Sequence, residues 1–190
     1  MDFVRKECEF PLIMGILNVT PDSFSDGGLF YDKQQAIEQG LKLIDDGADI
    51  IDIGGESTRP GAPGVAAEEE ITRVIPVIEG IIKHKPEALI SIDTTKYEVA
   101  HSAVAAGALI INDISGLSFD ERLAALAAES SSALILMHMQ GTPRTMQANP
   151  VYSNVVHEVF DFLNSRVQRA KSLGVKDRKS TRLNSSHRIR

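Results

Sequence analysis

Short apolar runs alternate along the chain with segments in which apolar residues recur at helical spacing. The runs lie at residues 10–17, 48–53, 89–92, 108–111 and 133–137. Each is almost continuously apolar, as strands buried on both faces of a sheet are. The alternation predicts five βα units in series and therefore a parallel sheet covered by helices.

The helices are predicted from apolar positions spaced three and four residues apart. Two such stripes are Ala36, Ile37, Leu41 and Ile44, and then Ile71, Val74, Ile75, Ile78 and Ile82. Three more helices are expected over about 96–106, 120–129 and 151–173. Pro76 lies inside the second helix and is expected to kink it, because proline has no amide N–H to donate to the preceding turn.

This pattern fits two architectures. A doubly wound sheet could be complete with five strands, whereas a TIM barrel needs eight strands and typically about 250 residues. The 190 residues suit one domain, and their pattern predicts no sixth strand. The number of strands does not distinguish these two architectures, so the distinction must come from the residues in the loops.

The composition and charge of the chain exclude some classes of binding partner and of metal site. The net charge is −6, and the last twelve residues contain four basic residues and no acid, so the rest of the chain is more acidic still. Such a body repels nucleic acid and anionic membranes. A single cysteine, Cys8, rules out an internal disulfide and a cysteine-based zinc cluster. The sequence has no signal-peptide core and no membrane-spanning run, so the expected location is the cytoplasm.

Polar loops follow the first two strands, on the side where parallel α/β enzymes build their sites. Residues 18–28 form a long loop whose oxygen atoms suit Mg²⁺ or a diphosphate, although turn chemistry alone would explain its composition. After the second strand, Ser57, Thr58 and Arg59 follow two glycines. Arg59 can bind an anion with two parallel hydrogen bonds, and the alternative is an ordinary solvated arginine.

The third strand ends in Asp93, and the fourth ends in Asn112 and Asp113. Consecutive strands thus bring a carboxylate and a carboxamide to the same height. The pair suits a heterocycle that offers N–H donors beside ring-nitrogen acceptors, such as a guanidine-like pyrimidinone edge. The alternative for Asp93 is a cap on the following helix.

The fifth strand leads into Met137 and His138. Met137 suits the floor of a flat pocket, although filling a core is the commoner task of a methionine. His138 has no nucleophile beside it and is expected to be structural. The other histidines lack metal-ligand spacing, and no P-loop, Rossmann fingerprint or nucleophile elbow occurs.

Together these loops resemble the dihydropteroate synthase family of pterin-binding barrel enzymes. The resemblance rests on residues 14–28, 52–61, 91–94, 112–115 and 137–141, and it covers about 10–175. It implies a TIM (β/α)8 barrel, here incomplete, and a transferase of folate biosynthesis. That enzyme would condense 6-hydroxymethyl-7,8-dihydropterin diphosphate with 4-aminobenzoate and release diphosphate, with no protein nucleophile.

The resemblance also implies roles for single residues. The implied substrate-binding residues are Thr58, Arg59, Asp93, Asn112 and Met137. Asn18 would contact the Mg²⁺ that holds the diphosphate, and Arg59 would lie near the diphosphate and 4-aminobenzoate. Asp93 and Asn112 would hydrogen-bond the pterin edge, and Met137 would pack beside the ring. The parent enzyme would be a homodimer.

The chain departs from the family after residue 175. The family's Asp-Pro-Gly sixth strand, lysine-bearing seventh strand and Arg-x-His eighth strand are absent. Residues 1–177 are therefore expected to be the N-terminal part of the barrel domain. Residues 178–190 are expected to be a non-native or disordered tail, with a natural basic tail as the alternative. Open edges at the first and fifth strands would leave the chain poorly stable, with little or no synthase activity.

Two other functions fit part of the pattern. A pterin-binding methyltransferase that carries a methyl group from methyltetrahydrofolate to a corrinoid protein would share the Asp and Asn contacts, but it would have no use for a diphosphate-binding loop. The second alternative is a non-catalytic pterin binder.

Overall fold

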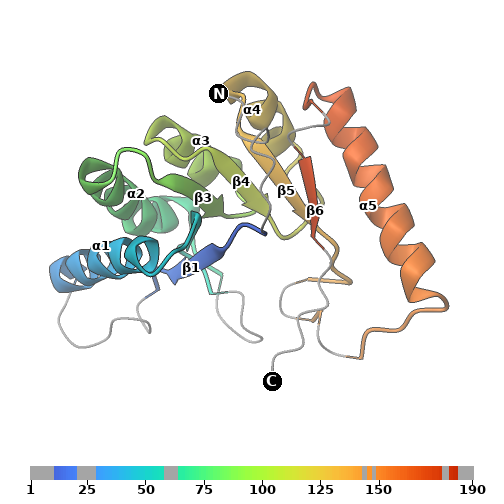
Figure 1. The fold of residues 1–190 in the computed structure, drawn as a ribbon. Coiled ribbons are helices and arrows are strands. Elements are labelled where there is room, and N and C mark those ends of the chain that lie inside the picture. Colours follow the sequence, from blue (N-terminus) through green and yellow to red (C-terminus); the bar gives the residue numbers. More distant parts are fainter. Residues whose placement is uncertain are drawn as a thin grey trace.

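The computed structural model describes residues 11–20, 29–57, 64–142, 145–146, 149–176 and 180–183. Strands and helices alternate along them (Figure 1). The strands are β1 (Met14–Asn18), β2 (Ile50–Gly54), β3 (Leu89–Asp93), β4 (Ile110–Asp113), β5 (Ala133–Met137) and β6 (Ser180–Leu183). The helices are α1 (Leu29–Asp45), α2 (Ala67–His84), α3 (Tyr97–Ala105), α4 (Arg122–Ser130) and α5 (Val155–Ser172). The five predicted βα units are all present.

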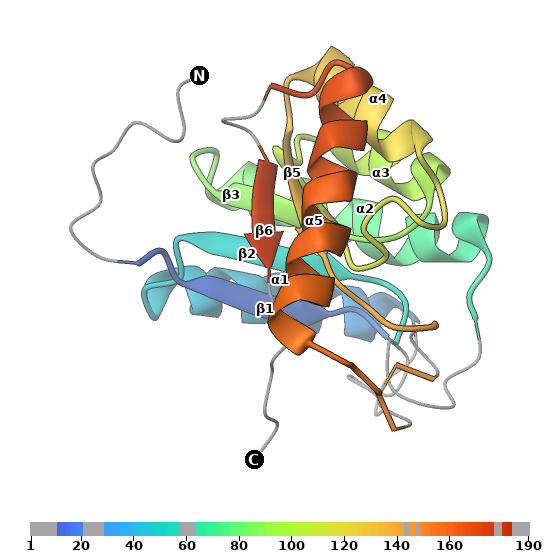
Figure 2. The ribbon, with the colours of Figure 1, turned by 90° about the vertical axis from the view of Figure 1, so that its right-hand side faces the viewer.

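The strands form one parallel sheet whose order follows the chain, β1-β2-β3-β4-β5-β6. A doubly wound sheet reverses its strand order part-way, whereas a TIM barrel adds each strand beside the one before it. Helices α1 to α4 cover one face of the curved sheet, and α5 lies beside β5 and β6 (Figures 1 and 2). The structure is therefore a sector of a barrel.

A short sixth strand corrects one prediction from the sequence. Residues 180–183, expected to lie in a tail without strands, pair in parallel with β5 from Leu134 opposite Ser180 to Met137 opposite Leu183. An unpaired strand edge offers a row of backbone N–H and C=O groups, which an extended segment can satisfy without an apolar pattern of its own. The free edges among the described strands are therefore β1 and β6, rather than β1 and β5.

The core lies between the sheet and its helices. Alternate strand residues face the helices and are almost fully buried there, and they are Leu17, Ile51, Ile53, Ile90, Ile92, Ile111, Leu134 and Leu136. The other residues of each strand point to the opposite face, here called the inner face. Ile50, Ile110 and Ile135 form a smaller apolar cluster on it. Polar residues follow this cluster towards the carboxyl ends of the strands.

One helix continues through its proline as predicted, and another begins later than predicted. α2 runs from Ala67 to His84 with Pro76 inside it, and the kink at Pro76 stays a prediction. α5 begins at Val155, later than predicted, because Asn154 caps it: the Asn154 Oδ1 accepts a hydrogen bond from the His157 backbone N–H at 3.1 Å. Among the described helices, none combines the length and the apolar character needed to cross a membrane.

Candidate functional site

Polar side chains meet where β1 to β4 end on the inner face. The sheet register places Asn18 opposite Gly54, Gly54 opposite Asp93, and Asp93 opposite Asn112. Asp93 and Asn112 therefore stand at one height, as the strand pattern predicts. Gly54 lies beside Asp93 on the other side, and a Cβ atom at Gly54 would be in ordinary van der Waals contact with Asp93 Oδ2, at 3.5 Å. These strand ends form the floor of the candidate site.

Asp52 joins this floor from one step further down β2. It lies two residues before Gly54 and so shares the inner face. Asn112 Nδ2 donates a hydrogen bond to Asp52 Oδ2 at 2.9 Å, and both side chains are buried, with 7% and 5% exposed. Asp52 Oδ1, Asn112 Oδ1 and Ser91 Oγ are buried without a hydrogen-bond partner in the described part of the chain. Buried polar atoms are nearly always bonded, so these three atoms indicate a ligand site.

The site is rich in negative charge. Burial raises the pKa of Asp93 well above its usual range, and the nearby carboxylates of Asp52 and Glu70 raise it further. Burial also raises the pKa of Asp52, against the lowering effects of the Ser91 hydroxyl beside it and of the Asn112 amide that donates to it. Neither Asp52 nor Asp93 forms an ion pair with another described residue. The floor thus suits a ligand that brings N–H donors.

Asp93 does not cap the following helix, so that alternative is wrong. α3 is preceded by Lys96 as its capping residue, and the first N–H of the helix, that of Tyr97, donates to Asp120 Oδ2 at 3.4 Å. The backbone N–H of Lys96 instead donates to Thr94 Oγ1 at 3.3 Å. The carboxylate of Asp93 is therefore available to bind a ligand in the candidate site.

Beside the floor lies an ion-pair network that the sequence did not reveal. Lys96 Nζ contacts both Glu56 and Glu70, and Glu70 is fully buried. These two carboxylates raise the pKa of Lys96 against the effect of burial. Glu56 Oε1 also accepts from the Val65 N–H at 3.2 Å, and Arg73 Nη1 donates to the Gly55 carbonyl at 2.8 Å. The network thus connects the end of β2 with the start of α2, at the two ends of the loop between them. The only sequence signal was the density of acids at 56 and 68–70.

Asp113 follows Asn112 in sequence but serves the fold. Its Oδ1 accepts from the Ser115 N–H at 2.8 Å and from the Ser115 hydroxyl at 2.7 Å, and its Oδ2 accepts from the Leu117 N–H at 2.6 Å. Leu117 has a φ of 64°, a conformation that costs free energy for a non-glycine residue. Asp113 therefore stabilises the turn after β4 and does not face a ligand.

The remaining predicted residues divide into two groups. Asn18 is exposed at the end of β1, in the same row as Asp93, and Met137 is half-buried at the end of β5 on the inner face. Thr58 and Arg59 lie outside the described residues. No group of three or more His, Cys, Asp or Glu side chains that could hold a metal ion occurs in the described ranges. Binding of Mg²⁺ through Asn18 stays a prediction.

His138 packs between β5 and α5. Its ring meets that of Phe162 edge-on at 5.0 Å and that of Tyr152 at 5.9 Å, and only 5% of the residue is exposed. Burial lowers its pKa, which favours the neutral ring. These contacts agree with the structural role predicted for His138.

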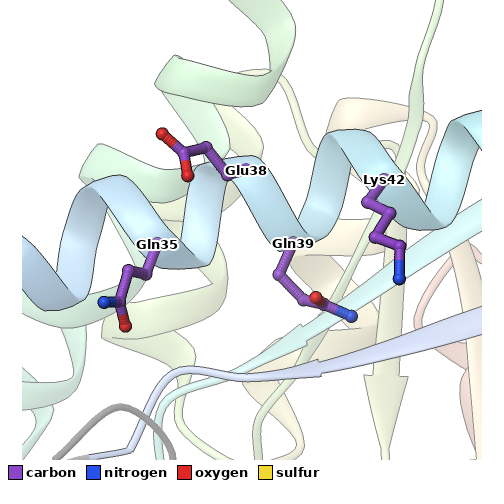
Figure 3. Close-up of a pocket in the computed structure, with 4 residues that line it drawn as sticks. All are labelled: Gln35, Glu38, Gln39 and Lys42. Carbon is purple, nitrogen blue, oxygen red and sulfur yellow. The ribbon is translucent and has the colours of Figure 1, made fainter.

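A surface hollow lies away from the strand ends. It is lined by Gln35, Glu38, Gln39 and Lys42, all from α1, on the helix layer rather than the inner face (Figure 3). Side chains from one exposed helix provide no convergent set of groups around a ligand. The strand ends are the stronger candidate.

Comparison with known proteins agrees with this geometry. The family described as pterin binding enzymes matches residues 14–180. This chain belongs to the family of pterin binding enzymes. Its relatives include dihydropteroate synthases from Synechocystis, 47% identical over 163 residues, and from Escherichia coli K12, 50% identical over 165 residues. The alignments cover 86% and 87% of this chain but 56% and 58% of those relatives.

Solved structures give the same answer for the fold. Dihydropteroate synthase from Xanthomonas albilineans with 4-aminobenzoic acid matches with a TM-score of 0.83 and 45% identity, over 92% of this chain and 61% of that one. The same enzyme in complex with 7,8-dihydropteroate matches with a TM-score of 0.78 and 41% identity, over 92% and 60%. The chain is thus an incomplete TIM barrel that spans about three fifths of the length of these relatives.

Proposed function

We propose that this chain is the pterin-binding part of a dihydropteroate synthase. The observation that carries the proposal is the set of acceptors from Asp52, Asp93 and Asn112, none of which pairs with a cation in the described structure. A pterin edge presents an amino group and ring N–H groups side by side, and these donors would satisfy the acceptors. The family match and the names of the relatives support the same ligand.

The proposed reaction joins a pterin methylene carbon to the amine of 4-aminobenzoate. The C–N bond forms as the C–O bond to diphosphate breaks, and the amine then loses its proton to water. No step needs a protein nucleophile. Asp93 and Asn112 would hold the ring in line with the amine, and Asp93 in its ionised form would stabilise positive charge that develops on the pterin.

Mg²⁺ is the proposed cofactor. Mg²⁺ usually keeps several waters and binds through one or two protein oxygens plus substrate phosphates, so a single exposed carboxamide at Asn18 fits that manner of binding. When bound, the ion would neutralise charge on the leaving diphosphate. Thr58 and Arg59 are proposed to contact the diphosphate and 4-aminobenzoate, and Met137 to pack against the pterin ring. A homodimeric parent enzyme and a cytoplasmic location stay predictions.

Binding by the 190-residue chain tests the proposal. Titration calorimetry with 6-hydroxymethylpterin should show binding that Asp93→Asn weakens at least about tenfold, the loss typical of a charged hydrogen bond. Asp46→Asn makes the same charge change at an exposed position and should leave the affinity unchanged. No binding by the wild type, or equal binding by both variants, would contradict the proposal.

A second assay separates the proposed reaction from its rivals. A chimaera joins this chain to the later barrel strands of a dihydropteroate synthase relative, and diphosphate release is followed with 4-aminobenzoate present. Release that depends on both substrates and on Mg²⁺ is expected. Methyl transfer to a corrinoid protein would favour the methyltransferase, and binding without either reaction would favour a pterin binder.

A further inference from the structure

The contact between Asp52 and Asn112 joins strands that are not neighbours. Asp52 is on β2 and Asn112 on β4, 60 residues apart, and the hydrogen bond passes across β3. In TIM barrels, side chains from alternate strands form one layer of the interior, so this pair belongs to a single layer. Across the sheet, the β3 residue in register with Asp52 is Ser91, whose small side chain leaves the path clear.

The chemistry of the two groups sets the orientation of the amide. An ionised carboxylate only accepts hydrogen bonds, and, against the effect of burial, the hydrogen bond from Asn112 lowers the pKa of Asp52 and so favours the ionised form. A carboxamide donates from one end and accepts at the other. Asn112 therefore turns its Nδ2 towards Asp52. A flipped amide would place Asn112 Oδ1 against Asp52 Oδ2, with two acceptors in contact and no proton between them.

With the amide held this way, the atoms that remain for a ligand are acceptors. Asn112 Oδ1 and Asp52 Oδ1 are buried and have no partner in the described structure, and the Asp93 carboxylate stands beside them without an ion pair. The Asn112 amide by itself could accept or donate towards a ligand. Its contact with Asp52 removes that freedom.

We propose that Asp52 is a positioning residue that holds the Asn112 carboxamide with Oδ1 towards the ligand and so makes the site select rings that present N–H donors. The identity of the ring as a pterin rests on the proposed function, but the orientation of Asn112 does not. Asp52 acts through Asn112 and need not touch the reacting atoms.

Ligand preference separates positioning from a merely structural role. Pterin carries an amino group where lumazine carries an oxygen, so the two rings differ by a donor and an acceptor. The wild type should prefer pterin. Asp52→Asn lets the Asn112 amide turn either way, so it should weaken pterin binding about tenfold, the loss of one buried hydrogen bond, while lumazine binding changes little.

The controls address stability. Asp46→Asn, an exposed acid with the same charge change, should keep the wild-type preference. A structural role for Asp52 would lower the affinity for both rings by the same factor, and that result overturns the proposal. Thermal melts of each variant show whether the protein remains folded.

A ligand-free measurement tests the orientation directly, even if Asp52→Asn does not fold. In the wild type, one Nδ2 proton of Asn112 should resonate downfield and exchange slowly, as a proton bound to a buried carboxylate does. Exposed Asn149 serves as the internal reference. If both amide protons of Asn112 behave like those of Asn149, the proposal is overturned. If the wild type binds neither ring, the proposed function and the selectivity fail, whereas the orientation is still decided by the Asn112 signals.

Discussion

Two pairs of acids lie close together near the candidate site, and they differ in their partners. Glu56 and Glu70 share the ammonium group of Lys96. Asp52 and Asp93 have no cation among the described residues, and burial raises the pKa of each. A buried charge with its own counter-ion serves the fold, whereas one without a counter-ion is costly unless a ligand supplies the missing donors. The presence or absence of a cationic partner, more than the depth of burial, therefore distinguishes the acids that stabilise the fold from the acids of the candidate site.

The largest expected effect on stability comes from removal of Lys96, the cation that Glu56 and Glu70 share. Lys96→Met leaves the fully buried Glu70 without a counter-ion and should lower the free energy of unfolding by about 3–5 kcal/mol. Urea denaturation measures this change. Lys85→Met removes a more exposed lysine paired with Asp45 and should cost far less. Equal losses in the two variants would show that Lys96 is an ordinary surface lysine.

Next is the acid that neighbours the site but belongs to the fold. Asp113→Ala removes the acceptor of three hydrogen bonds in the turn after β4, at a cost of about 2–3 kcal/mol. Asp113→Asn keeps part of this acceptor capacity and should lose less. Pterin affinity, measured where each variant is folded, should stay close to that of the wild type. A specific loss of affinity with unchanged stability would place Asp113 in the site instead.

A smaller effect of opposite sign is expected at Asp93. Asp93→Asn removes a half-buried charge that other carboxylates repel, and it should stabilise the protein by roughly 1 kcal/mol at neutral pH while weakening pterin binding. The folded chain holds the Asp93 proton to a higher pH than the unfolded chain does. The free energy of unfolding of the wild type should therefore fall as the pH rises from the ordinary carboxyl pKa through the raised pKa of Asp93.

The pH series provides the control for that prediction. Urea denaturation of the wild type and Asp93→Asn at several pH values should show a gap that widens with increasing pH. A gap that does not depend on pH would mean that Asp93 has an ordinary pKa. It would also remove the contrast with the Lys96 network.

The smallest effect is expected from an exposed ion pair outside both groups. Arg169 on α5 donates from Nε and Nη2 to Glu121, which precedes α4, and both side chains are about half exposed. Pairs of this kind are screened by solvent and add little. Glu121→Gln should leave the melting temperature unchanged within error. A clear drop would mean that the α4–α5 contact depends on this pair.

The sequence predicted the residues that strands deliver, and it missed the contacts between distant strands. Asp93 and Asn112 were found because a polar residue at the end of a buried strand is a local signal. Asp52 lies inside an apolar strand, where its charge was itself a sign of function, but its partner is 60 residues away. β6 was missed because its four residues dock by backbone pairing and carry no apolar pattern.

The order of the strands has a consequence for how the chain assembles. Each strand pairs with the one made just before it, so every sheet contact closes a loop only one βα unit long, and the entropy of loop closure stays small. Contacts of such short range favour stepwise folding from the N-terminus during synthesis. The Asp52–Asn112 hydrogen bond is an exception, since it skips a strand. This hydrogen bond can form only after β4 has paired with β3, so the first four strands assemble before the candidate site is complete.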